Sequence, residues 1–120
     1  MKGNTPMKQA IGQTKAAKYR NQKTEYQGIQ FDSRKEASRY QELLWMQAAG
    51  VICHIELQPR YDLVVNGNKL GFYRADFRYE ETKSGQVITE DVKSPVTKTA
   101  VYQLKKKLVK ALYGVEIVEV

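Results

Sequence analysis

The sequence predicts an α/β (α+β) protein: one mixed β-sheet flanked by helices, in the order αβββαβ. Apolar residues recur at helical spacing in two segments, 32–50 and 97–114, which enclose a run of strand-like segments. An alternating segment, 115–120, follows the second helix. Short turns join antiparallel strands, whereas a helical crossover leads to a parallel one, so the sheet should contain both kinds of pairing.

The elements begin with a short hairpin over 24–31 that turns at Gln27–Gly28. A helix then opens after residue 32, because Ser33 with Glu36 three residues later forms a capping box. Apolar residues at helical spacing continue this helix to residue 48, and Gly50 ends it.

Strands joined by turns come next. Three or four strands are expected here, formed by the segments 51–57, 61–65, 70–79 and 86–93. The separators are Pro59, the turn Asn66-Gly67-Asn68 and a polar loop over 80–85. Pro95 ends the fourth segment, and a helix over 97–112, closed by Gly114, leads to the last strand.

The composition limits the class of protein. The 120 residues fit one domain, and 42% hydrophobic with 28% charged residues is typical of a soluble globular chain. The lone cysteine, Cys53, excludes an internal disulfide and suits a reducing cytoplasm. The longest apolar run, 43–46, is too short to cross a membrane, and no apolar N-terminal segment indicates a secretory signal. We therefore expect a cytoplasmic protein with no membrane partner.

The positive charge is concentrated at the N-terminus. The net charge is +7, and residues 1–24 carry six of the 20 basic residues and none of the 13 acidic ones. This weakly apolar segment predicts a flexible basic arm, 1–24, ahead of a single domain over 25–120. Such an arm either grips the phosphate backbone of a nucleic acid or only keeps the protein soluble.

Two aspartates and a lysine carry the clearest chemical signal. Asp91 and Lys93 lie two residues apart in one strand, so their side chains share a face while Val92 points into the core. The hairpin loop brings Asp76 within cross-strand distance of Asp91. Paired carboxylates repel unless a cation compensates them, and hard oxygen ligands suit Mg²⁺ (or Mn²⁺). The alternative is a solvated hairpin face with ordinary ion pairs.

The lone histidine is expected to have no chemical role. His54 has no acidic or cysteine partner at the spacing of a metal site, although Cys53 precedes it. Both are therefore predicted to be ordinary sheet residues, with Cys53 buried as a small hydrophobe.

Asp76 followed by Asp91-x-Lys93, between a first helix and a basic second helix, resembles the PD-(D/E)XK, or restriction-endonuclease-like, nuclease superfamily. A longer series of motifs is similar to a family of small, uncharacterised phage and prophage proteins: Lys18-Tyr19-Arg20-Asn21, Phe31-Asp32-Ser33 with Glu36, Gln58-Pro59, Ala75-Asp76-Phe77, Glu90-Asp91-Val92-Lys93 and Tyr113-Gly114. The resemblance extends from residue 18 to 120. It implies a restriction-endonuclease-like fold and a metal-dependent DNA endonuclease of phage type, working in the host cytoplasm on branched or other recombination and replication DNA.

Two other functions stay open beside the nuclease. One is a nucleic-acid-binding module of the same fold that has lost catalysis. The other is a phage accessory protein that binds an acidic protein partner through its basic arm and helix.

The resemblance implies a role for each matching residue. The metal ligands would be Asp76, Asp91, the backbone carbonyl of Val92 and Glu36, and the other catalytic residues would be Lys93 and Gln58. The capping box already accounts for Glu36, so that residue has two competing roles. Ala75 stands where the superfamily name has proline. Because Glu90 directly precedes Asp91, a one-residue slip would exchange the two acids, and alternation with Lys93 favours Asp91.

The second helix is basic. It carries five lysines and no acid: Lys98, Lys105, Lys106, Lys107 and Lys110. They form either a solvated face opposite the apolar stripe or a surface that contacts phosphates. In the second case the nucleic-acid contacts are expected at Lys18, Arg20, Lys98, Lys105 and Lys106.

A homodimer is the expected assembly. One active site of this kind cuts one DNA strand. The chain is too short to contain a second active site, so a two-fold symmetric partner would supply it. The candidate interface consists of Trp45 and Met46 on the first helix and the final strand, which would otherwise leave an open edge. Trp45 alternatively completes the core.

Overall fold

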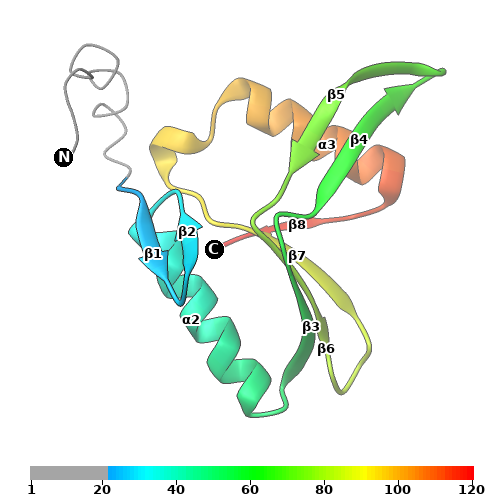
Figure 1. Cartoon of the computed structure of the whole chain (residues 1–120). Coiled ribbons are helices and arrows are strands. Elements are labelled where there is room, and N and C mark those ends of the chain that lie inside the picture. Colours follow the sequence, from blue (N-terminus) through cyan, green and yellow to red (C-terminus); the bar gives the residue numbers. More distant parts are fainter. Residues whose placement is uncertain (1–21) are drawn as a thin grey trace, which may run out of the picture. The chain divides into compact units, whose positions relative to one another are not determined.

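A computed structural model describes residues 22–120 (Figure 1). The chain divides into two compact units, Met1–Ala37 and Ser38–Val120. No helix in the described part of the chain combines the length and the apolar character needed to cross a membrane. Most of the predicted arm, with Lys18 and Arg20, lies outside the described residues.

The first unit contains the predicted hairpin. β1 (Thr24–Tyr26) and β2 (Ile29–Phe31) pair antiparallel. Gln27 and Gly28 between them both have positive φ angles, 52° and 81°, as a type I′ turn requires. Helix α2 (Arg34–Ala48) begins in this unit, where the Ser33 hydroxyl accepts a hydrogen bond from the Glu36 N–H at 3.1 Å. The predicted hairpin and the Ser33 cap are therefore confirmed.

The second unit is built on a four-stranded sheet. Its strand order is β3-β6-β7-β8, with the bounds Ile52–Leu57, Phe77–Glu81, Val87–Asp91 and Ile117–Glu119. β6 pairs antiparallel with both β3 and β7, whereas β7 and β8 are parallel. Helix α3 (Ala100–Tyr113) connects the parallel pair and gives the crossover its length. The structure is thus the mixed α+β fold that the sequence predicts.

A ribbon of two strands, β4 (Arg60–Val65) and β5 (Asn68–Arg74), forms a sheet of its own. The prediction of one strand over 70–79 is therefore wrong, because the chain leaves the ribbon after Arg74 and enters β6 at Phe77. The chain that pairs with these strands also passes from one sheet to the other, between β3 and β4, at Gln58–Pro59. Proline has no N–H to donate to a strand ladder at this point. Together β3-β4 and β5-β6 form one long hairpin that is interrupted at this level.

Helix α3 begins later than the sequence predicts. Residues 95–97 form a 3₁₀ turn, η1 (Pro95–Thr97), in which the Thr97 hydroxyl accepts a hydrogen bond from the Ser94 N–H at 2.9 Å. Thr99 then caps the helix, because its hydroxyl accepts from the Tyr102 N–H at 3.1 Å. Gly114, with φ 70°, ends the helix as predicted.

The two faces of the four-stranded sheet have different neighbours. On one face, Tyr40 of α2 stacks on Phe77 of β6, with ring centroids 6.1 Å apart. On the opposite face, the Tyr61 hydroxyl of the ribbon lies 3.0 Å from the Thr89 hydroxyl of β7. The core between the ribbon, α3 and β8 contains Tyr61, Leu63, Tyr73, Ala75, Tyr102, Val109 and Ile117. In Figure 1, α3 runs beside β4 and β5, which it contacts. The candidate site lies on this second face.

Candidate functional site

The place where the long hairpin changes sheet fixes the position of Asp76. The Gln58 N–H donates to the Asp76 carbonyl at 2.9 Å, and the Ala75 N–H donates to the Pro59 carbonyl at 3.0 Å. Ala75 is fully buried, which explains a small residue at this point. Gln58, itself exposed and with φ 53°, therefore lies beside the site and supports Asp76 through its backbone.

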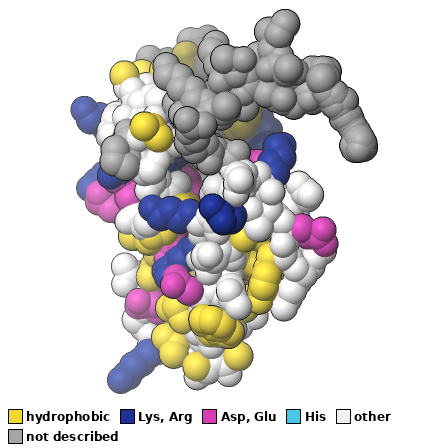
Figure 2. All heavy atoms as spheres, turned by 90° about the vertical axis from the view of Figure 1, so that its left-hand side faces the viewer, with side chains coloured by type: hydrophobic (Ala, Val, Ile, Leu, Met, Phe, Trp, Pro, Cys, Tyr) yellow, Lys and Arg dark blue, Asp and Glu magenta, His cyan; other side chains and the backbone are white. Residues whose placement is uncertain are grey.

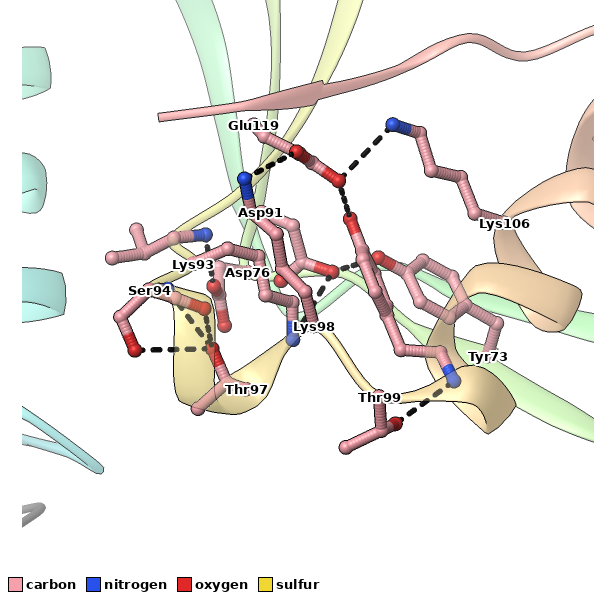
Figure 3. Close-up of polar contacts among 12 residues, drawn as sticks. Tyr73, Asp76, Asp91, Lys93, Ser94, Thr97, Lys98, Thr99, Lys106 and Glu119 are labelled. Carbon is pink, nitrogen blue, oxygen red and sulfur yellow. Dashed lines mark hydrogen bonds and ion pairs between the residues drawn. The ribbon is translucent and has the colours of Figure 1, made fainter. Parts of the chain in front are cut away.

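Asp76 lies against the end of β7. The strand register places Phe77 opposite Glu90, and the Asp76 N–H continues the ladder by donating to the Glu90 carbonyl at 3.1 Å. The Asp76 carboxylate turns back to β7, where its Oδ2 accepts a hydrogen bond from the Val92 N–H at 2.7 Å. As a result, Asp76, Asp91 and Lys93 gather at one point, as Figure 3 shows.

Asp91 is a buried carboxylate on the core side of the sheet. Only 3% of its surface is exposed, and its Oδ2 accepts a hydrogen bond from the Tyr73 hydroxyl. Burial raises the pKa of Asp91 to about 6, and Glu119 raises it further, while Lys93 and Lys106 act in the opposite direction. The charged form of this carboxylate is therefore poorly compensated by the protein itself.

Lys93 occupies the predicted position beside Asp91. Its Nζ lies 3.9 Å from Asp91 Oδ2 and 4.4 Å from the centroid of the Tyr102 ring. The side chain is 19% exposed, so most of its stem is packed while the ammonium stays at the site. Carboxylate and aromatic ring together hold the ammonium in place.

Glu119 is a member of the site that the sequence did not reveal. The parallel register of β7 and β8 places it opposite Asp91. Its carboxylate accepts a hydrogen bond from the Tyr102 hydroxyl at 2.7 Å and pairs with Lys98 and Lys106, each at 3.1 Å (Figure 3). These donors lower the pKa of Glu119 to about 2, the Tyr102 hydroxyl contributing most. Lys98 and Lys106 are thereby directed toward the site.

Glu90 points away from the site, to the α2 face. It is 1% exposed, and Arg39 of α2 binds both of its oxygens, with Nε–Oε1 at 2.9 Å and Nη2–Oε2 at 2.6 Å. The Tyr79 hydroxyl donates to the same carboxylate. The structure thus separates the two neighbouring acids: Glu90 belongs to a buried ion pair, and Asp91 shares its surroundings with Lys93.

The lysines of α3 do not form a uniformly unpaired basic face. Lys110 pairs with Glu116 at 2.5 Å, and the Lys105 ammonium lies 5.8 Å from the centroid of the Phe72 ring. Figure 2 presents a different side of the molecule, on which basic and acidic side chains are interspersed. Glu116, just before β8, and Glu119 in β8 therefore supply acidic partners to a helix that has none of its own.

The metal-binding and catalytic roles expected of the site residues all stay predictions, and for Glu36 and Val92 the structure shows only local contacts. Glu36 belongs to the first unit, where its N–H completes the α2 cap. For Val92, the structure gives a half-buried residue whose N–H binds Asp76, while a metal contact by its carbonyl stays a prediction.

Asp91→Asn is expected to stabilise the metal-free protein near neutral pH. The pKa of Asp91 is raised from 3.8 to about 6, so the folded protein binds this proton more tightly than the unfolded chain does. Ionisation therefore opposes folding above about pH 6, by about 3 kcal/mol, and this effect disappears below about pH 4.

Urea unfolding in EDTA, compared between wild type and Asp91→Asn across this pH range, measures the effect. The variant should be more stable near neutrality and equal to wild type in acid. A variant that is less stable at every pH would show that the ionised carboxylate contributes net attraction.

Comparison with known proteins places the chain in a family without assigning an activity. No curated protein and no solved structure shows significant similarity to it. Residues 16–117, most of the 120, match the family described as "Protein of unknown function (DUF1064)", and the chain therefore belongs to this family.

Proposed function

We propose that the protein is a metal-dependent DNA endonuclease of phage type that hydrolyses phosphodiester bonds. One observation carries the proposal: Asp76, Asp91 and Lys93 lie together, with the Asp76 carboxylate bound to the Val92 N–H and Lys93 Nζ 3.9 Å from Asp91 Oδ2 (Figure 3). This arrangement supports the resemblance to PD-(D/E)XK nucleases, which assigns metal binding to the two acids and catalysis to the lysine. By analogy, the substrate is branched or other recombination and replication DNA.

The donor set fits a hard divalent cation. Asp76 and Asp91 offer carboxylate oxygens, and the burial that raises the pKa of Asp91 leaves its negative charge in need of a partner. Mg²⁺ and Mn²⁺ prefer oxygen ligands and keep several waters, so two carboxylates and the Val92 carbonyl are a suitable set. When bound, the ion would activate a water and stabilise charge on the phosphate.

The chain's own residues then divide the remaining tasks. Lys93 supplies a fixed positive charge next to Asp91, where it stabilises a phosphate or orients the attacking water. Lys98 and Lys106, held at the site by Glu119, supply further charge toward the DNA backbone. Glu119 itself accepts a hydrogen bond from the Tyr102 hydroxyl and pairs with both lysines.

Cleavage assays with defined DNA test the proposal. Purified protein is incubated with supercoiled, linear, single-stranded and four-way-junction DNA in Mg²⁺, in Mn²⁺ and in EDTA. Cleavage of at least one substrate that requires the metal supports the proposal. Salt-dependent DNA binding without cleavage in either metal would instead identify an inactive binding module, and absence of DNA binding would favour an acidic protein partner.

Deleting residues 1–17 is expected to weaken DNA binding. The deletion removes Lys2, Lys8 and Lys15, so fewer phosphates are neutralised and fewer counterions are released. The dependence of log affinity on log salt should flatten, by up to about 3 if all three lysines contact phosphates. Affinity measured over a salt series checks this. An unchanged slope would show that these lysines do not contact DNA.

The protein is expected to be a two-fold homodimer, because breaking both strands requires two sites. The structure leaves candidate interface material exposed: Trp45 is 62% exposed, and Val118 lies on β8, an edge strand of the described sheet. Light scattering at micromolar concentration, with and without DNA, determines the assembly. A strict monomer in both conditions that cuts both strands at equal rates would contradict the prediction.

A further inference from the structure

The chain's only cysteine and only histidine meet one carboxylate at the edge of the sheet. Cys53 and His54 are adjacent in β3, and Glu80 lies in the neighbouring strand β6. His54 Nδ1 is 2.9 Å and Cys53 Sγ 3.8 Å from Glu80 Oε1, and one ligand atom from each residue lies within 4.8 Å of the other two. The expectation that His54 has no acidic partner is therefore wrong, and so is the expected burial of Cys53, which is partly exposed.

The backbone of β3 departs from regular strand geometry to produce this arrangement. Neighbouring side chains of a strand normally point to opposite faces, so Cys53 and His54 should not reach the same carboxylate. Here the pairing with β6 is shifted between Cys53 and Glu56, and His54 has a φ of 58°. A residue with a side chain pays about 1 kcal/mol or more for this conformation. The bulge places the histidine next to the Cys53–Glu80 pair.

We propose that Cys53, His54 and Glu80 bind one divalent transition-metal ion of the Zn²⁺ class. A thiolate, an imidazole and a carboxylate are each ordinary zinc ligands, whereas a thiolate is a poor ligand for Mg²⁺. Two anionic ligands match the charge of a divalent ion. Zinc–ligand bonds of about 2.0–2.3 Å require ligand atoms roughly 3.3–3.8 Å apart, close to the present separations.

Exposure gives the ion both a route of entry and room for a water as a fourth ligand. The side chain of His54 is 80% exposed and that of Glu80 is 35% exposed. The bound ion ties β3 to β6 at the bulge. This site is distinct from the site of Asp76 and Asp91. Glu80 follows Asp76 by four residues, and four residues of extended chain span about 13 Å.

Cobalt binding tests the proposal on the full-length protein. The protein is reduced, stripped with EDTA and titrated with Co²⁺, whose bond to a thiolate gives a charge-transfer absorption in the near ultraviolet. Because the chain has one cysteine, this band reports Cys53 alone. We expect the band to saturate at one Co²⁺ bound to Cys53 per chain, to be lost on displacement by Zn²⁺ and to resist excess Mg²⁺, and we expect a higher melting temperature with Zn²⁺.

Variants separate the site from a lone thiol and from the aspartate pair. Cys53→Ser should abolish the band, and His54→Asn and Glu80→Gln should each weaken Co²⁺ binding at least about ten-fold. Asparagine is chosen because it tolerates positive φ, so the bulge persists. Asp91→Asn should leave the band unchanged, which keeps this test independent of the nuclease proposal. No band in wild type, or a band unaffected by both His54→Asn and Glu80→Gln, would overturn the inference.

Discussion

Lys93→Ala is expected to lower DNA cleavage in Mg²⁺ by about 100-fold or more, while DNA affinity changes only a few-fold. The carboxylate of Asp91, 3.9 Å away, and the ring of Tyr102, 4.4 Å away, hold the ammonium at the site. A charge fixed at the reacting group acts mostly in the transition state, so its removal lowers kcat more than binding. Single-turnover cleavage rates and equilibrium DNA affinities in EDTA measure the two effects separately.

Lys107→Ala is the matched control for this experiment. It removes the same charge from an exposed position on α3 and should leave the cleavage rate close to that of wild type. If both variants lost cleavage equally, the effect would be one of total charge. If Lys93→Ala cut DNA at nearly the wild-type rate, the assignment of the motif would be wrong.

The parts of the fold that were predictable have local signals. Ser33 and Gly50 mark the ends of the α2 segment, and Gln27–Gly28 supplies the positive φ angles of the first turn. The approach of Asp76 to Asp91 was also predictable, because alternation and a short hairpin loop determine which side chains share a face.

The parts that were missed depend on distant residues. No residue between Arg74 and Phe77 signals that the strand ends and a new one begins. The break lies opposite Pro59 of the partner strand, whose carbonyl accepts a hydrogen bond from the Ala75 N–H. Glu119 meets Asp91 through the register of a parallel crossover, and alternation within one strand does not give that register. The alternation pattern also does not predict the bulge at His54. There, one residue with a positive φ angle determines which side chains lie next to each other.

Glu90→Gln is expected to lower the free energy of unfolding by about 3 kcal/mol. Both oxygens of Glu90 accept hydrogen bonds from Arg39, and the Tyr79 hydroxyl donates to one of them. A glutamine amide has one oxygen and an NH₂ group, and the latter would face a donor of the guanidinium. With Glu90 only 1% exposed, water cannot readily replace the lost partner. Urea unfolding at neutral pH gives the magnitude.

The same substitution should leave Mn²⁺ affinity nearly unchanged in the folded protein, because Glu90 faces α2 and Asp91 faces the core side where Tyr73 binds it. Asp91→Asn should behave in the opposite way, keeping the fold while Mn²⁺ affinity and cleavage fall together. Mn²⁺ titrations followed by electron paramagnetic resonance, under conditions where both variants are folded, separate the two. Loss of metal binding in Glu90→Gln but not in Asp91→Asn would mean that the metal-facing register of β7 is displaced by one residue, since adjacent side chains of a strand point to opposite faces.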